Sequence, residues 1–267
     1  PLREGRMVQA FDANAKRYVS GQARSAVWDE NGWPKRPIEP HYWVRWEDIP
    51  SDLSREGSRI YWASVTGPTN ERTAMAARVH ESISGHSLNV LHFTPEASVP
   101  ATILAVFNSF VFDWLIRLTV AQNLTQNFLG PAPFARKVPH PQLLELVDLV
   151  SSETVEYASR ADARAELDAA VALAYELSYG DFVHIIDTFY VAKKARLDRL
   201  EPPLPGEARS TVTRDLALAA YCRLAGAHDP EHADRARAAR SVGAYGYVAN
   251  PLRQRISRLA SPLSAPG

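Results

Sequence analysis

The residues best suited to chemistry in this chain are side-chain amides, four of which lie between positions 122 and 127. They are Gln122, Asn123, Gln126 and Asn127, and they follow a long apolar run. An amide presents a donor beside an acceptor, so it can pair with the edge of a nucleic-acid base, adenine above all. The spacing predicts a base-reading segment on a rigid support, and a polar helix end is equally consistent with it.

A second polar stretch, residues 69–73, follows Gly67 and Pro68 and contains Asn70, Arg72 and Thr73. An arginine fork can take guanine and an asparagine can take adenine. In this interpretation Arg72→Ala changes the DNA sequence preference by about 1–3 kcal/mol at one base pair. The same residues also suit a turn in which polar side chains cap backbone groups, so both interpretations stay open.

Basic residues alternate with aromatic residues in the first 45 positions, where Arg17 precedes Tyr18 and the pair Lys35–Arg36 precedes Tyr42. Cations contact phosphates and rings stack on bases, although charged residues over a Trp-rich core give the same pattern. Together, the three stretches define the DNA contacts that we predict: Arg17, Lys35, Arg36, Asn70, Arg72, Thr73, Asn123, Gln126 and Asn127.

The sequence lacks the motifs of enzymes that transfer methyl groups, cut DNA with a metal ion or bind nucleotide phosphates. No G-x-G occurs for a methyl-donor pocket, and the only Pro-Pro pair precedes Leu204 instead of an aromatic residue. No Lys has an acid two residues before it, as a metal-dependent nuclease requires, and there is no phosphate-binding loop. We therefore predict no catalytic residue and no cofactor-binding residue within the chain.

Two weaker patterns are discounted on spacing. His80, His86 and His92 recur every six residues, whereas zinc ligands come in closer pairs. The stretch 85–89 begins like a nucleophile elbow but lacks its second glycine. We predict neither a metal site nor a catalytic serine.

The elements that must position the polar residues can be read from hydrophobic periodicity. Strands are expected at 42–46, 58–65, 73–79 and 87–93, and a helix from Pro100 to Leu118. Further helices are expected at 141–156, 161–177, 179–189, 211–224 and 230–242. The sequence therefore predicts an α+β fold, with a strand-rich module at 1–138 and a helical module at 139–267.

Composition limits the partners. The 30 basic and 30 acidic residues give a net charge of zero, which argues against an unaided nucleic-acid binder but suits a module beside a basic partner domain. The single cysteine, Cys222, excludes an internal disulfide and a cysteine-rich zinc site. With no signal peptide and no apolar run of membrane-spanning length, we expect a cytoplasmic protein without membrane contact.

Five blocks of the chain resemble, in the same order, blocks of a large family of adenine-N6 DNA methyltransferases. That family includes type IIG restriction-modification enzymes and the methyltransferases of DISARM and BREX phage defence. The blocks are Leu2–Asp12 (LREGRMVQAFD), Arg59–Thr73 (ending NERT), Asn108–Trp114 (NSFVFDW), Asn123–Phe128 (NLTQNF) and Arg164–Ile186 (beginning RAELDA).

The resemblance implies that residues 1–138 are a DNA target-recognition module and that Pro1 lies near its junction with a catalytic domain. That N-terminal methyltransferase domain or subunit would bind S-adenosylmethionine, flip the target adenine out of double-stranded DNA and methylate it. The helical module would buttress the recognition module or dock to the catalytic one. The main alternative, which the neutral charge favours, is an interaction subunit of a phage-defence complex that touches no DNA. A third is a stand-alone enzyme with an unrecognised site.

Overall fold

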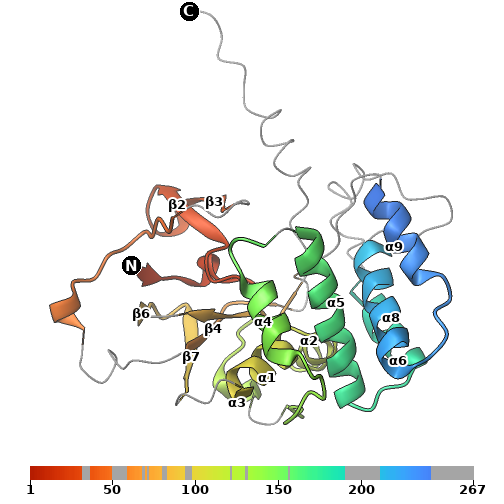
Figure 1. The fold of residues 1–267 in the computed structure, drawn as a ribbon. Coiled ribbons are helices and arrows are strands. Elements are labelled where there is room, and N and C mark those ends of the chain that lie inside the picture. Colours follow the sequence, from red (N-terminus) through yellow and green to blue (C-terminus); the bar gives the residue numbers. More distant parts are fainter. Residues whose placement is uncertain are drawn as a thin grey trace, which may run out of the picture.

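The computed structural model describes residues 1–31, 37–49, 59–67, 70, 72–79, 83–93, 98–120, 122–129, 132–155, 157–189 and 211–241. Small sheets occupy the N-terminal part of the chain, and helices pack beside them and make up the remainder (Figure 1). This arrangement confirms the predicted α+β fold.

A three-stranded antiparallel sheet lies at the centre of the N-terminal part. Its middle strand, β4 (Arg59–Ala63), pairs with β5 (Ala76–Val79) on one side and β7 (Leu88–His92) on the other. Ile60 and Trp62 of β4 join the main hydrophobic cluster, whereas Tyr61 packs on the opposite face. Both faces of β4 are therefore covered, which explains its continuous apolar sequence.

The predicted helix from Pro100 to Leu118 is two helices, α1 (Ser98–Phe107) and α2 (Phe110–Arg117), bent by 61°. The bend lies at two polar residues whose side chains are committed elsewhere. Asn108 Oδ1 accepts from the Ala76 amide at 2.8 Å and its Nδ2 donates to the Ala76 carbonyl at 2.9 Å. Ser109 caps α2 by accepting from the Phe112 amide. The Asn108 bonds fix the helix pair to the edge strand β5, and the Ser109 cap begins α2.

Two further strand pairs were not predicted. β1 (Leu2–Arg3) pairs in parallel with β6 (Ile83–Ser84), and β2 (Lys16–Ser20) forms an antiparallel hairpin with β3 (Val27–Glu30). Short 3-10 turns are η1 (Gly5–Met7), η2 (Ala23–Ser25) and η3 (Trp46–Asp48).

The strand expected at 42–46 is wrong. Residues 42–45 have no regular structure, and Trp46 begins η3. Trp43 and Trp46 are 70% and 68% exposed, so this segment has no sheet face to bury. Aromatic composition favours a strand only where a neighbouring strand and a covered face are available.

The helical part contains every helix that the sequence predicted beyond residue 140. These are α4 (Leu143–Ser151), α5 (Tyr157–Ala174), α6 (Tyr179–Asp187), α8 (Thr211–Ala225) and α9 (His232–Ser241), and a short α3 (Gln126–Leu129) precedes them. The main hydrophobic cluster extends from Trp62 through Phe112 to Phe182 and Leu218. It therefore crosses the expected boundary at residue 138, and the division into two modules stays a sequence prediction.

Within the described ranges, no single helix has the length and apolar composition to cross a bilayer. The bent pair α1–α2 meets those two criteria only when its helices are taken together.

Candidate nucleic-acid interface

The predicted polar stretch 122–127 pairs with the residues that follow the end of β4. The Thr66 amide donates to the Gln122 carbonyl at 3.0 Å, and the Leu124 amide donates to the Ser64 carbonyl at 2.8 Å. Between these bonds, Val65 and Asn123 form an antiparallel bridge. We call the segments 64–67 and 122–127, together with Asn70, the amide platform.

The backbone of the amide platform is tied to the sheet beneath it. Leu124 is fully buried, and its carbonyl accepts from Trp62 Nε1 at 2.9 Å and from Asn89 Nδ2 at 3.1 Å. Trp62 belongs to β4 and Asn89 to β7, and the Trp62 ring packs against Phe107 of α1. The platform is thus held by strands and a helix, which position side chains more firmly than an unsupported loop would.

The amide platform carries neutral polar groups at exposed positions. Gln122, Asn123, Gln126, Asn127 and Asn70 are all exposed. Among the described residues, the first four donate no side-chain hydrogen bond and accept none, so their amide groups are available to a ligand. The structure therefore links Asn70, through Thr66, to the segment that carries Gln122 and Asn123. DNA contacts by Asn70, Asn123, Gln126 and Asn127 stay a prediction.

Arg72 and Thr73, in contrast, lie beneath the platform. Arg72 Nε contacts Asp113 Oδ2 at 2.7 Å, and its guanidinium lies 4.4 Å from the centre of the Phe110 ring. The Thr73 amide donates to both Asp113 oxygens at 3.0 and 3.1 Å, and Thr73 Oγ1 donates to the Gly67 carbonyl. Base contacts by these two residues stay a prediction, and their placement favours the alternative of a hydrogen-bonded turn.

Asp113 is the residue that sequence reasoning missed. It is completely buried on α2, and it also accepts from Arg117 Nε at 3.2 Å. Arg117 Nη2 in turn donates to the Asn70 carbonyl at 2.9 Å. Arg72, Thr73, Asp113 and Arg117 form what we call the Asp113 latch. The signal was a lone acid between Phe112 and Trp114, because a carboxylate in a buried helix needs cationic or backbone partners.

The third predicted stretch is separate from the platform. Arg17 lies on β2, where its guanidinium contacts Asp29 at 3.4 Å and Glu39 at 3.0 Å. In Figure 1 the β2–β3 hairpin lies above the β4–β7 strands and α3 lies below them. Lys35 and Arg36 lie outside the described residues. Arg17 is consequently not part of one continuous surface with the amides.

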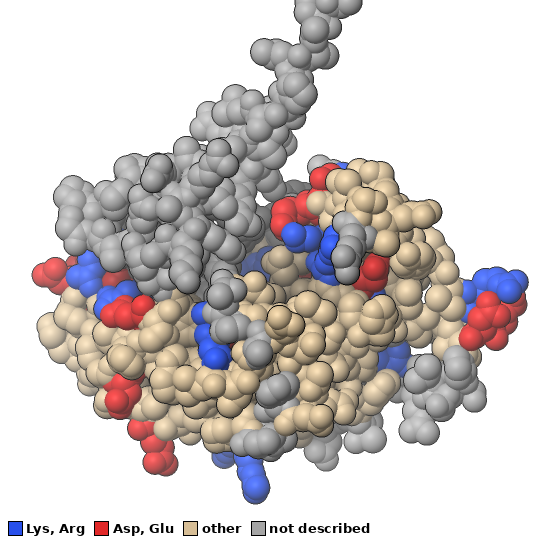
Figure 2. All heavy atoms as spheres, turned by 180° about the vertical axis from the view of Figure 1, so that it is seen from behind, with Lys and Arg blue, Asp and Glu red and all other residues tan. Residues whose placement is uncertain are grey.

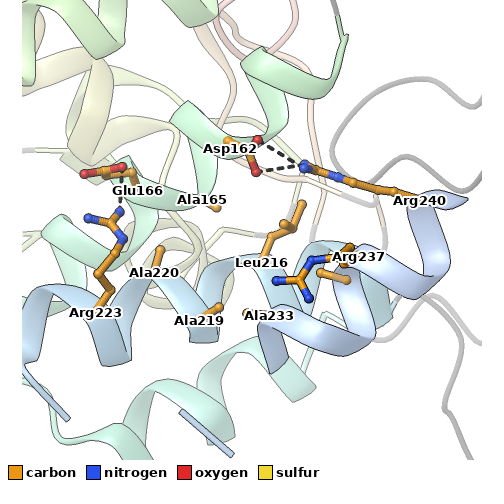
Figure 3. Close-up of a pocket in the computed structure, with 11 residues that line it drawn as sticks. Asp162, Ala165, Glu166, Leu216, Ala219, Ala220, Arg223, Ala233, Arg237 and Arg240 are labelled. Carbon is orange, nitrogen blue, oxygen red and sulfur yellow. Dashed lines mark hydrogen bonds and ion pairs between the residues drawn. The ribbon is translucent and has the colours of Figure 1, made fainter. Parts of the chain in front are cut away.

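A trough between α5, α8 and α9 is a second candidate site, with a volume of about 410 Å³ (Figure 3). Leu216, Ala219, Ala220 and Arg223 line it at the helical spacing of α8. Its rim carries two ion pairs, Arg240–Asp162 at 2.9 Å and Arg223–Glu166 at 2.7 Å. The apolar floor of the trough could receive the apolar face of an amphipathic helix.

A hydrogen-bonded chain of titratable groups joins α6, α8 and α9. His232 Nδ1 lies 2.6 Å from Asp215 Oδ1, and His232 Nε2 lies 2.7 Å from the Tyr179 hydroxyl. Burial raises the pKa of the Tyr179 phenol, which therefore keeps its proton. None of the three residues lines the trough, and they link the helices. Within the described ranges, no three His, Cys, Asp or Glu side chains gather as a metal ion would require.

Comparison with protein-family models, with curated proteins and with solved structures finds no match to this chain. The family resemblance consequently rests on the five residue blocks, and the site rests on its own geometry.

Proposed function

We propose that this chain is the DNA target-recognition part of an adenine-N6 DNA methyltransferase of the restriction-modification or phage-defence type. The observation that carries the proposal is the amide platform. Two blocks that resemble the methyltransferase family, ending at Thr73 and beginning at Asn123, lie side by side although fifty residues separate them. Together they expose amides on a backbone that the sheet holds in place, and those of Asn123, Gln126 and Asn127 have no side-chain partner among the described residues.

The platform would act by hydrogen bonding to base edges. Each side-chain amide of the platform has a donor and an acceptor, which can bond directly to base edges in a groove. The amides proposed for this role are those of Asn70, Asn123, Gln126 and Asn127. Because the supporting backbone is already ordered, little conformational entropy is lost on binding. The methyl transfer itself, with S-adenosylmethionine, would belong to a catalytic domain or subunit on the N-terminal side.

The charge distribution supports DNA binding that is shared between this chain and the catalytic domain. Basic and acidic side chains lie in small mixed groups on the face drawn in Figure 2, without a broad basic field among the described residues. Phosphate contacts supply much of the affinity for DNA. In this proposal the catalytic domain supplies most of that attraction, and this chain supplies the choice of sequence.

The test is a binding titration of the full chain with duplexes selected from a random-sequence pool. We expect enrichment of one sequence and an affinity that falls steeply with salt. Asn123→Ala and Gln126→Ala each remove one base contact and cost about 1–3 kcal/mol of binding. Gln142→Ala removes an exposed amide in the helical part and should change nothing. Absence of an enriched sequence would refute the proposal.

The second candidate function is an interaction subunit that touches no DNA. The trough favours it, and so do the exposed Trp43 and Trp46, because tryptophan is enriched where proteins bind one another. Ala219→Gln narrows the trough. It would disrupt assembly with the other subunits of the complex if this function is correct, and it would leave DNA binding unchanged if the amide platform is the site.

A further inference from the structure

The functional groups on the amide platform point to one kind of base pair. We propose that the platform reads A·T pairs from the major groove and does not read G·C pairs. This inference rests on the proposed DNA-recognition function and specifies its substrate. It follows from three observations: which cations are engaged, which amides are free, and which apolar side chain lies beside them.

The cations of residues 59–129, the stretch that contains the platform, are buried or already used within the chain. Residues 59–129 contain no lysine and four arginines. Arg72 and Arg117 both bind Asp113, and Arg78 binds Asp148. Arg59 is 5% exposed within β4. Guanine offers two acceptors, O6 and N7, which an arginine fork matches with two donors. No guanidinium of this region is presented to read guanine in that way.

The amides match adenine instead. In the major groove, adenine offers the N7 acceptor beside the N6 amino donor. One carboxamide satisfies both, because its nitrogen donates to N7 and its oxygen accepts from N6. Gln122, Asn123, Gln126 and Asn127 are exposed and have no side-chain partner among the described residues.

Val65 supplies a contact for a thymine beside the adenine. Its side chain is 72% exposed, and it lies directly opposite Asn123 in the antiparallel bridge. Directly opposite residues project to the same side of such a pair, with Cβ atoms about 4.5–5.5 Å apart. Thymine carries its C5-methyl group in the major groove, where aliphatic side chains contact it. An amide and an aliphatic group side by side are therefore suited to adenine and a neighbouring thymine.

The width of the grooves decides which one the platform enters. The segments 64–66 and 122–124 are joined by one antiparallel bridge and two backbone hydrogen bonds, so they lie side by side like a very short two-stranded ribbon. A ribbon fits the major groove, about 12 Å wide, whereas the minor groove is about 6 Å wide and displays no methyl group. The platform consequently reads from the major-groove side.

Single-atom changes in the DNA test this inference with the full chain. Once a binding duplex has been selected, each adenine is replaced by 7-deazaadenine, which lacks the N7 acceptor, and each thymine by uracil, which lacks the methyl group. We expect about a tenfold loss of affinity at one or more adenines and a roughly fourfold loss at a neighbouring thymine, the effect of one methyl group. Replacement of guanine by 7-deazaguanine should have no effect.

Two variants assign these effects to residues. In Asn123→Ala, 7-deazaadenine at one position should no longer weaken binding, and in Val65→Ala, uracil at one position should no longer weaken it. Both positions are exposed, so neither change removes a buried group. Gln142→Ala should retain both sensitivities.

The outcomes separate the two proposals. A selected site whose affinity depends on guanine N7 overturns the A·T inference and leaves the recognition function standing. So does an adenine or thymine effect that Asn123→Ala and Val65→Ala leave intact. Failure to select any sequence refutes the recognition function itself.

Discussion

The amide platform and the trough place their charges in opposite positions. In the platform, charged groups lie beneath the surface, where Asp113 is 0% and Arg72 10% exposed, and neutral amides lie on top. In the trough, the floor is alanine and leucine, and the charges form the rim, where Asp162 and Arg223 are each 58% exposed.

This difference indicates what each region can do. A buried ion pair acts in a low-dielectric environment, where it fixes one geometry and is costly to break. A rim ion pair is screened by water and salt, so its partners can be exchanged at little cost. The platform is consequently a rigid surface suited to neutral base edges. The trough is an adaptable groove suited to another protein segment.

Removing the central carboxylate should have the largest effect. Asp113→Ala leaves Arg72 and Arg117 without their buried partner and frees the Thr73 amide. We expect a loss of about 3–5 kcal/mol in the free energy of unfolding, measured with urea. Asp148→Ala is the matched control, because Asp148 pairs with Arg78 while 50% exposed, and should cost no more than about 1 kcal/mol. Equal losses would contradict the distinction between buried and exposed ion pairs on which the comparison depends.

Arg72→Ala comes next and separates a structural role from a base-reading role. Arg72 contributes a charge-assisted bond to Asp113 and stacks on Phe110, whereas Asp113 keeps its bonds to Arg117 and Thr73. We expect a loss of about 1.5–3 kcal/mol in unfolding free energy. The sequence selected from the random pool should be unchanged. A new preference at one base pair with unaltered stability would restore the base-reading interpretation.

Much of the fold could be predicted from the sequence because its patterns are local. The helices beyond residue 140 and the strands of the central sheet follow from apolar periodicity and burial. The elements that were predicted wrongly depend on contacts between residues far apart in the sequence. The helix breaks at Asn108 because that side chain bonds to Ala76. The segment 42–46 stays irregular and largely exposed because its backbone bond to β1, from the Leu2 amide to the Tyr42 carbonyl, does not extend into a strand ladder.

The candidate site, likewise, could be predicted only in part. The sequence marked polar residues able to contact bases, but side-chain type does not tell whether a residue faces solvent. Gln122 and Arg72 are both polar, yet one is exposed on the platform and the other is held by Asp113. The contact between residues 65 and 123 that creates the platform leaves no local signature either.

Alkaline pH offers a smaller, graded test on the sheet beneath the platform. Burial raises the pKa of the Tyr61 phenol above the ordinary 10.0. The unfolded chain therefore releases this proton more readily than the folded one. Stability from this group is complete below pH 10 and is lost as the pH rises from there through the raised pKa of the folded state. Tyr61→Phe should flatten the fall of unfolding free energy in that range. An unchanged slope would show that other groups cause it.

The smallest effect is expected at the rim of the trough. Arg240→Ala removes the contact with Asp162, whose side chain is 58% exposed. A double-mutant cycle with Asp162→Ala should give a coupling of about 0–1 kcal/mol. That coupling should fall further near 1 M salt, where screening acts over only about 3 Å. The coupling of Arg72 with Asp113, measured in the same way, should be larger and nearly independent of salt. If both couplings respond equally to salt, the latch is open to water, and the rigidity on which the platform depends is lost.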